Sequence, residues 1–486
     1  MDAKHSAEAL LAGDGRSEPK RASAGADAWL GPSLFVWSVW ALMTLAGLAF
    51  VYLYGMNVPF QDEFDAIVPV LTGNEQFNLE YLWEQHNEHR IPAAKLIIWL
   101  LYQVSGDLRP TMYFNVLALS AAAAFLVRAA WRFRGRPSYL DAFFPVVLLH
   151  WGHFANMLWA FQVSYVLGAL FTCLALCIVV ASRNRLELRA AVAEVGCLFG
   201  LTMCGASGVA LVPPLAAWLG YAAVQTAWSG EKQARWNGVW TGLLALVPFA
   251  LIAGYFYHYH PAALSHGTPG IDAALTVGCQ FVAMGLGRAV VPVWQCAVVA
   301  LLTGAVVVVG CLLRACRRGE GRCGAAGFLA FLAGMAILVA GVGWGRAGFG
   351  PEQGFEWRYV TLSAPLLCWL YLAWEAYGPR SLGEFLPACL FTAVCILFWP
   401  NLQSGRDIGG GLRQLVGGLE HDASAGVPAS VLARGRTWWL HPSAQVLQNR
   451  FEMLRRAGWG KFRYKAGAKS APDPDRTAGN SQRASP

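Results

Sequence analysis

The sequence predicts an all-α integral membrane protein with about eleven transmembrane helices. Hydrophobic residues make up 56% of the 486 residues and charged residues only 14%, and the chain contains 21 Trp. Soluble domains do not have this composition. Apolar runs of about 20 residues, the length that crosses a bilayer, alternate with short basic clusters. Because most of the basic residues behind the net charge of +8 lie in these clusters, we expect the lipid bilayer as a partner and no nucleic acid.

The predicted organisation begins with a polar stretch of mixed charge, residues 1–30, which we expect to be a disordered cytoplasmic tail. The first apolar run starts too far from residue 1 and is too long for a cleaved signal peptide, so we expect it to remain as a signal anchor. A polytopic transmembrane domain is expected over 31–400. Its long first extracytoplasmic loop, 56–109, should carry helices that lie on the membrane surface. A small helical extracytoplasmic appendage over 401–465 and a disordered tail over 466–486 would follow.

The positive-inside rule orders the predicted spans, because short loops rich in Lys and Arg stay in the cytoplasm. The segments RAAWRFRGR, SRNRLELR and EKQAR are such loops. We expect 272–287 to be a half-buried or surface helix, because a full crossing there would place RACRRGEGR outside. The tail is basic too, but long tails translocate largely regardless of charge. The expected spans are 33–55, 110–130, 139–154, 161–181, 190–206, 207–227, 237–256, 290–313, 324–343, 359–377 and 385–400.

The twelve cysteines lie in or at the ends of apolar runs. No CxxC pair occurs, and no His stands at the spacing of a zinc ligand. We interpret these cysteines as small apolar thiols packed between helices.

With this topology, most of the unusual polar residues lie on the outer side. They occur in the segments QDEFD, LWEQHNEHRIP, HWGHFANMLWAFQ, YHYHP and GRAGFGPEQGFEWRY. Ionisable groups beside a bilayer are costly unless they pair or face water. Their gathering on one side therefore predicts a functional site.

Three acids, Asp62, Glu63 and Asp65, follow the first apolar run and allow two interpretations. An acid here can begin an amphipathic helix that lies on the outer membrane surface, because the helix dipole favours acids in the first turn. Alternatively, a carboxylate at the mouth of a cavity can take a proton from an attacking hydroxyl or hold a divalent cation such as Mg or Mn. Asp62, Glu63 and His86 would be the ligands of such a cation.

The next polar segment carries His86, Asn87, Glu88, His89 and Arg90 in succession. It can be a solvated loop before a helix. It can also bind phosphate through Arg90, since a guanidinium makes bidentate contacts, or use a histidine in acid/base or metal chemistry.

Two further arginines, Arg346 and Arg358, bracket the last large outer loop. Each can be a residue that extends its charge to the membrane interface, and together they can neutralise a phosphate head group.

Over residues 33–400 the chain resembles the GT-C superfamily of polytopic glycosyltransferases. The resemblance is carried by the acidic QDEFD after the first span, the long loop and returning span, ANMLWAFQ, and the basic GRAGFG…EWRYVTLSAP. It is nearest to bacterial members related to protein O-mannosyltransferases and lipid A aminoarabinose transferases. Such enzymes transfer a sugar from a polyprenyl-phosphate donor to an extracytoplasmic acceptor, with inversion. The resemblance implies a bacterial inner membrane protein whose active site faces the periplasm.

The resemblance also implies roles for single residues. Asp62 or Glu63 would be the base that receives the proton of the acceptor hydroxyl, with Asp65 as support. A sugar or supporting role would fall to Asn156 and Gln162, and to the segment from His86 to His89. The donor phosphate would be held by Arg90, Arg346 and Arg358. A lipid-linked donor needs no nucleotide-binding loop, and we find neither a P-loop nor a Rossmann fingerprint. Some members of the superfamily need no metal, so a divalent cation stays open.

Three other functions stay open at this point. A carrier or flippase of lipid-linked saccharides would favour paired halves and charges at the midplane of the membrane. A polymerase or ligase of preassembled glycans would place its large loop late in the chain, and here the larger loop comes first. A non-catalytic assembly subunit would tolerate loss of the acids. The acceptor, whether an envelope glycan, a lipid or a protein, is also open.

Overall fold

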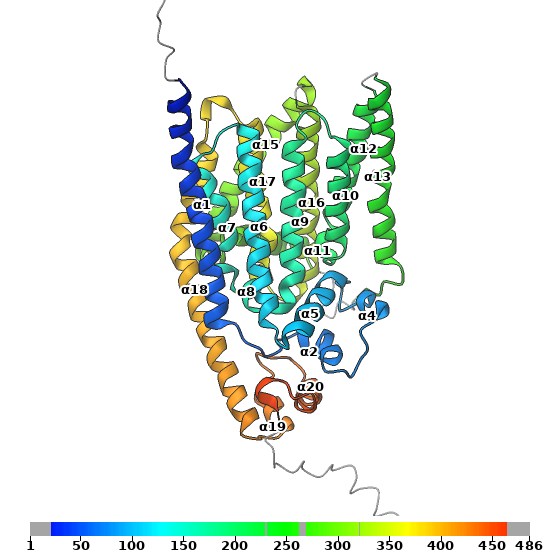
Figure 1. Cartoon of the computed structure of the whole chain (residues 1–486), viewed down its shortest axis with the longest axis vertical. Helices are drawn as coiled ribbons and strands as arrows, with labels where there is room; N and C mark the ends of the chain where they lie inside the picture. The colour runs from blue at the N-terminus through cyan, green and yellow to red at the C-terminus, as the bar shows by residue number, and fades with distance from the viewer. Residues whose placement is uncertain (1–20, 229–230, 262–268, 320, 464–486) are drawn as a thin grey trace, which may run out of the picture.

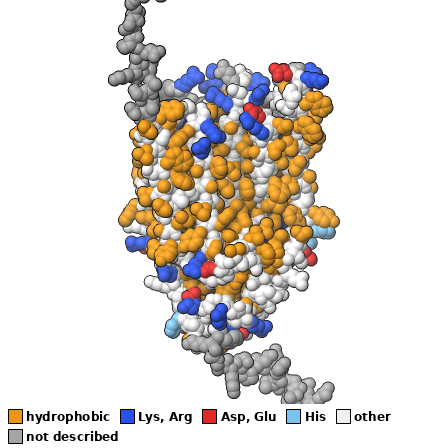
Figure 2. All heavy atoms as spheres, in the orientation of Figure 1, with side chains coloured by type: hydrophobic (Ala, Val, Ile, Leu, Met, Phe, Trp, Pro, Cys, Tyr) orange, Lys and Arg blue, Asp and Glu red, His pale blue; other side chains and the backbone are white. Residues whose placement is uncertain are grey.

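The computed structural model describes residues 21–228, 231–261, 269–319 and 321–463. These residues form helices and no β-strand. Figure 1 shows the helices side by side in one bundle, and Figure 2 shows a broad hydrophobic band around its middle. The prediction of an all-α membrane protein is therefore confirmed.

Within the described residues, eight helical segments are long and apolar enough to cross a membrane. Of the eleven predicted spans, 139–154, 190–206 and 359–377 are not among them. The eight segments are Trp29–Tyr54, Arg109–Arg134, Ala160–Ala181, Ala206–Ala227, Lys232–Phe256, Arg288–Arg318, Arg322–Phe349 and Phe385–Ser424. The long helices within them are α1 (Arg21–Tyr54), α6 (Arg109–Arg134), α9 (Val163–Ala181), α12 (Val212–Ala227), α13 (Lys232–Phe256), α15 (Trp294–Arg318), α16 (Arg322–Arg346) and α18 (Phe385–Ser424).

The predicted span 139–154 forms short pieces instead of one helix. They are η1 (Tyr139–Ala142), α7 (Phe143–Leu149), η2 (Trp151–His153), α8 (Phe154–Leu158) and η3 (Ala160–Gln162). The first break lies at His150, whose backbone is extended and whose Nδ1 accepts a hydrogen bond from Gly152 N at 3.0 Å. Such a local bond competes with the helix. The remaining described helices of the bundle are α10 (Leu188–Thr202), α11 (Ala206–Val209) and α17 (Tyr359–Tyr377).

The segment expected to be a half-buried helix forms α14 (Ile271–Ala283), which has 13 residues. That length is below the roughly 20 residues that cross a bilayer. The helix continues into the short turns η4 (Met284–Leu286) and η5 (Arg288–Val293), which lead to α15. α14 lies against α16, where the position of a side chain at Gly343 is taken by the backbone of Ala274.

Residues 56–109, which the topology prediction places outside and which we call the first outer loop, contain the short helices α2 (Glu63–Ala66), α3 (Val68–Leu71) and α4 (Leu79–Trp83) and the longer α5 (Pro92–Ser105). Figure 1 shows this loop at one end of the bundle, beside the C-terminal helices α19 (Ala429–Arg434) and α20 (Ala444–Arg456). The two parts share a hydrophobic core that includes Phe64, Ile67, Leu440 and Phe451.

Two predicted boundaries differ from the helices. α1 begins at Arg21, inside the stretch expected to be a disordered tail, while residues 1–20 lie outside the described residues. α18 has 40 residues and runs through residue 400 without a break, so the boundary expected there falls inside a helix. The tail expected over 466–486 lies outside the described residues.

Candidate functional site

A cavity of about 1150 Å³ lies where the first outer loop, the C-terminal helices and the loop after α16 meet. This volume is slightly above the range of about 300–1,000 Å³ that is usual for cavities that bind small molecules. Its wall brings together residues that are far apart in the sequence. The polar and aromatic ones include Gln61, Asp62, His86, Asn87, Glu88, His89, Trp159, Tyr165, Arg288, Arg346, Glu352, Gln353, Glu356, Trp357, Arg358, Trp438 and Trp439.

Gln61 turns the chain so that Asp62 reaches this cavity. Its φ is +49°, a left-handed conformation that residues other than glycine rarely adopt. Two bonds to the C-terminal part hold the turn, because Gln61 N donates to Leu440 O at 2.9 Å and Gln61 Nε2 donates to Trp439 O at 2.8 Å. Strained backbone at a cavity wall is typical of functional sites.

Asp62 is the one acid of the first acidic segment that lines the cavity. Its side chain is 31% exposed, and its Oδ1 lies 3.7 Å from His86 Nε2. Burial acts to raise the pKa of Asp62, but the hydrogen bond and charge of His86, with the charges of Arg358 and His89, lower it below its ordinary value. Asp62 is therefore ionised at neutral pH. It makes no hydrogen bond to the start of α2, so it does not cap that helix.

Glu63 does not line this cavity but lies in the wall of an apolar pocket beside it, so the cavity gives no support to the catalytic role predicted for Glu63. The residue is 1% exposed. Its Oε2 accepts a hydrogen bond from Phe60 N at 2.9 Å, and its Oε1 accepts one from Phe161 N at 2.8 Å. Burial raises the pKa of Glu63 to about 8. Since both carboxyl oxygens are engaged by backbone N–H groups, Glu63 joins the first outer loop to the broken helix at 160–162.

The segment 86–89 forms a tight turn on the cavity wall. His86 N donates to His89 O at 2.8 Å, and His89 N donates to His86 O at 2.9 Å. Asn87 takes the left-handed conformation with φ of +48°, which Asn tolerates well. Burial lowers the pKa of His89 to about 4, so this imidazole is neutral. All four predicted residues of this segment line the cavity.

Arg90 does not line the cavity, and the structure corrects the phosphate-binding role predicted for it. It is 6% exposed and lies over the ring of Trp83. Its guanidinium donates to four backbone carbonyl oxygens, those of Trp83 (2.5 Å), Tyr255 (3.0 Å), Tyr257 (2.9 Å) and His258 (3.0 Å). These bonds join the loop before α5 to the end of α13 and leave no free fork for a phosphate.

Arg346 and Arg358 both line the cavity, and their role in holding a phosphate stays a prediction. Arg346 Nη2 donates to Glu88 Oε1 at 3.0 Å, so this charge is partly neutralised. Arg358 has no ion pair with any described residue, and its buried Nε has no hydrogen-bond partner there. An unpaired buried N–H is costly. Arg358 is therefore a candidate for binding an anion in the cavity.

Arg288 also lines the cavity, and sequence reasoning missed it. Its guanidinium lies 5.2 Å from the centre of the Trp357 ring. Asn401 holds the turn before it, because Asn401 Nδ2 donates to Leu286 O and Asn401 Oδ1 accepts from Ala289 N, both at 2.9 Å. The sequence did contain a signal for Arg288, because it is the sole charged residue between Asp272 and Arg314. Lone charges in apolar runs mark functional positions.

Asn156 and Gln162 are buried and do not line the cavity, which corrects the sugar-binding role predicted for them. Asn156 Nδ2 donates to Arg358 O at 3.1 Å, and Asn115 Nδ2 donates to Asn156 O at 2.9 Å. Asn156 therefore holds the backbone of Arg358. Gln162 is 1% exposed, and the structure assigns it no contact with the cavity.

The C-terminal part contributes Trp438, Trp439 and Pro442 to the cavity wall, and sequence reasoning missed them as well. Asp65 does not line the cavity. Its Oδ2 lies 3.0 Å from His441 Nε2, so it holds the C-terminal part beside the first outer loop. The supporting role of Asp65 in the site stays a prediction. For Trp438 and Trp439, the signal available in the sequence was a pair of adjacent tryptophans in a polar segment.

Of the predicted cation ligands, Asp62 and His86 lie 3.7 Å apart, and Glu63 does not join them. The Glu63 carboxyl is engaged by two backbone N–H groups, as described above. Among the described residues, no group of three or more His, Cys, Asp or Glu side chains is arranged to hold a metal ion. We therefore assign no step to a metal.

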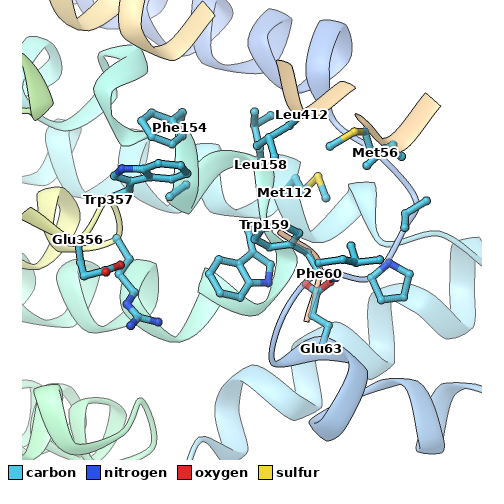
Figure 3. Close-up of a pocket in the computed structure, with 16 residues that line it drawn as sticks. Met56, Phe60, Glu63, Met112, Phe154, Leu158, Trp159, Glu356, Trp357 and Leu412 are labelled. Atoms are coloured by element: carbon cyan, nitrogen blue, oxygen red, sulfur yellow. The ribbon is translucent and has the colours of Figure 1, made fainter. Parts of the chain in front are cut away.

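An apolar pocket adjoins the cavity (Figure 3). The two share the wall residues Phe60, Trp159, Glu356, Trp357, Arg358 and Leu412. Figure 3 shows the Glu63 carboxyl next to Phe60, and the apolar side chains of Met112, Leu158 and Leu412 in the same pocket. The arrangement thus provides an apolar compartment, a cation at its edge and a polar compartment with a carboxylate.

Comparison of the chain with protein-family models, with curated proteins and with solved structures finds no match.

Proposed function

We propose that this multi-pass membrane protein is a glycosyltransferase that moves a sugar from a polyprenyl-phosphate donor to an acceptor hydroxyl. One observation carries the proposal. The ionised carboxylate of Asp62 and the guanidinium groups of Arg288, Arg346 and Arg358 line one cavity, and that cavity shares a wall with an apolar pocket. A lipid-linked phosphosugar has the matching three parts, namely an apolar chain, an anionic phosphate and a polar sugar.

In this proposal, the prenyl chain enters the apolar pocket and its phosphate lies at Arg358. Burial makes this cation effective, because a charge pair is stronger where water is excluded. Arg288 and Arg346 lie on the same cavity wall and add positive charge. The sugar then extends into the polar compartment, where the turn of residues 86–89 offers hydrogen-bonding side chains.

The chemical step forms a bond between the acceptor oxygen and the anomeric carbon, and it breaks the bond from that carbon to the phosphate oxygen. The proton of the acceptor hydroxyl passes to Asp62 Oδ, and polyprenyl phosphate leaves with the bonding electrons. Its developing negative charge is stabilised by the arginines. Attack on the face opposite the phosphate inverts the anomeric centre. His86 orients Asp62 and holds it in the ionised form.

The orientation follows from charge. The short basic segments RAAWRFRGR and SRNRLELR lie at the C-terminal ends of α6 and α9, at the end of the bundle opposite the cavity, and the positive-inside rule assigns that end to the cytoplasm. We propose that the cavity faces the periplasm of a bacterial inner membrane. The acceptor would then be a glycan, lipid or protein of the cell envelope.

The test uses the full-length protein in lipid nanodiscs with a set of polyprenyl-phosphate sugars and envelope acceptors. Release of polyprenyl phosphate is measured together with sugar transfer. Asp62→Asn is expected to lower the transfer rate about 10²-fold or more. Asp65→Asn is the matched control, because it makes the same chemical change in the same loop outside the cavity wall. Equal rates for the Asp62→Asn variant and the unmodified protein would overturn the carboxylate role.

A second outcome separates transfer from transport. A flippase moves the intact lipid-linked saccharide across the bilayer and releases no polyprenyl phosphate. Translocation of intact donor by both the unmodified protein and Asp62→Asn, without bond cleavage, would therefore replace the transferase proposal with a carrier.

A further inference from the structure

A second cavity lies at the other end of the bundle, between the C-terminal ends of α6 and α9. Its volume is about 470 Å³. The wall combines three arginines with apolar side chains and contains no acid. The lining residues are Phe125, Arg128, Ala129, Arg132, Phe133, Cys177, Val180, Ala181 and Arg183. None of them takes part in the site described above.

Among the described residues, no acid forms an ion pair with these three arginines. Arg128 and Arg132 are four residues apart on α6, so they lie on one face of the helix. Neither has an ion pair with a described residue. Arg183 lies over aromatic rings, 5.4 Å from the centre of Phe133 and 5.8 Å from that of Tyr377.

Arg134, which lies close to them at the end of α6, differs because it is paired with acids. Arg134 Nη2 donates to Asp141 Oδ1 at 2.8 Å, and its Nε donates to Glu375 Oε2 at 2.9 Å. The same end of the molecule therefore pairs some arginines with acids. No described acid pairs with the three around the cavity, which is the arrangement expected for an anionic ligand.

The height of the cavity along α6 indicates where that ligand comes from. Arg128 stands six residues before the end of α6 at Arg134, which is about 9 Å inside the helix end. Phe125, one turn deeper, is 49% exposed on the apolar outer surface. Figure 2 shows the basic side chains of this end directly beyond the hydrophobic band. A ligand here would have its phosphate at the arginines and its acyl chains along the apolar surface.

We propose that this cavity binds the phosphate of an anionic phospholipid from the leaflet at this end of the bundle. Arginine suits this role, because its planar fork matches phosphate oxygens and is weakly hydrated. Basic pockets between transmembrane helices bind lipid head groups in this way. Free phosphate has the same anion chemistry, but it makes no use of the apolar wall at Phe125 and Val180.

The experiment measures thermal unfolding of the full-length protein in detergent. Three additions are compared: phosphatidylglycerol, phosphatidylcholine with the same acyl chains, and inorganic phosphate. We expect phosphatidylglycerol to raise the Tm most. Each arginine near the membrane surface contributes about fivefold to binding of an anionic lipid. The double variant Arg128→Gln/Arg132→Gln should therefore need a phosphatidylglycerol concentration more than about tenfold higher for the same shift.

The matched control is the double variant Arg185→Gln/Arg189→Gln, which removes the same charge from the same end of the molecule outside the cavity wall. It should respond to phosphatidylglycerol like the unmodified protein. An equal loss of response in both double variants would show that general surface charge is responsible and would overturn the proposal. Equal stabilisation by phosphatidylcholine, or by inorganic phosphate alone, would also overturn it. None of these readouts depends on sugar transfer.

Discussion

The loop before α5 and the loop after α16 both carry arginine beside apolar helices, and they use it in opposite ways. In the first loop, Arg90 donates to four backbone carbonyl oxygens and holds two segments together. In the second, Arg358 faces a cavity with a buried Nε that has no partner among the described residues. A satisfied buried cation stabilises a fold, whereas an unsatisfied one marks a place for a ligand. The same residue type therefore predicts neither role until its partners are known.

Identical substitutions of the two arginines test this contrast most directly. Arg358→Met removes the cation from the cavity and should lower the sugar-transfer rate about 10²-fold, because a fixed donor to the developing phosphate charge is lost. Its Tm should stay within a few degrees, since the lost Nε–H makes no bond among the described residues. The rate is measured in nanodiscs on the monodisperse fraction. A normal rate would remove Arg358 from the site.

Arg90→Met should have the reverse effect. The change leaves four carbonyl oxygens without their donor, which is expected to lower the free energy of unfolding by about 3 kcal/mol. Transfer by the protein that remains folded should change little. Thermal unfolding followed by circular dichroism gives the stability. The transfer rate is measured separately and divided by the amount of folded protein. A stable Arg90→Met variant with a low transfer rate would return Arg90 to the phosphate site.

The buried acid Glu63 makes the stability of the protein depend on pH. The pKa of Glu63 is raised to about 8 by burial, so between its ordinary value of 4.5 and about 8 the folded chain binds the proton that the unfolded chain has lost. Stability should therefore fall as pH rises through this window, by at most about 1.4 kcal/mol per pH unit. Glu63→Gln should flatten that slope, and Asp65→Asn should keep it.

Replacement of His86 should have a smaller effect, and the direction in which it moves the pKa of Asp62 can be predicted. Its hydrogen bond and charge lower the pKa of Asp62 against the effect of burial. His86→Gln should therefore raise the pKa of Asp62, and the acid limb of the kcat/KM profile for sugar transfer should move to higher pH. An unchanged profile would separate His86 from the carboxylate.

The smallest expected effect is that of the contact between Asp65 and His441. The pair is partly exposed, with Oδ2 to Nε2 at 3.0 Å, so its contribution to stability should be about 1 kcal/mol or less. His441→Ala should make proteolysis after α18 faster while the transmembrane helices stay intact, as limited digestion would reveal. Unchanged digestion would mean that the shared hydrophobic core alone holds the C-terminal part.

Much of the bundle could be predicted from the sequence, because apolar length and basic loops act locally. The ends of α6, α9 and α13 lie within a few residues of the predicted spans. The segment 139–162 could not be predicted as broken, because its breaks depend on bonds such as that of His150 to Gly152 N. α18 extends past residue 400 because its outer half packs on the C-terminal helices, and a hydropathy pattern does not record that contact.

For the candidate site, the sequence by itself determined that polar segments far apart in the chain would gather at one end of the bundle, because topology alternates with each crossing. Only the tertiary structure decided which side chains meet there. It placed Asp62 on the cavity wall and Glu63 on the wall of the adjoining apolar pocket, engaged Arg90 with carbonyl oxygens and added Arg288 and Trp438 to the cavity. The physical reason is that adjacent side chains in a short helix point in different directions. Some of their partners come from distant segments, such as Phe161 for Glu63 and Tyr255 for Arg90.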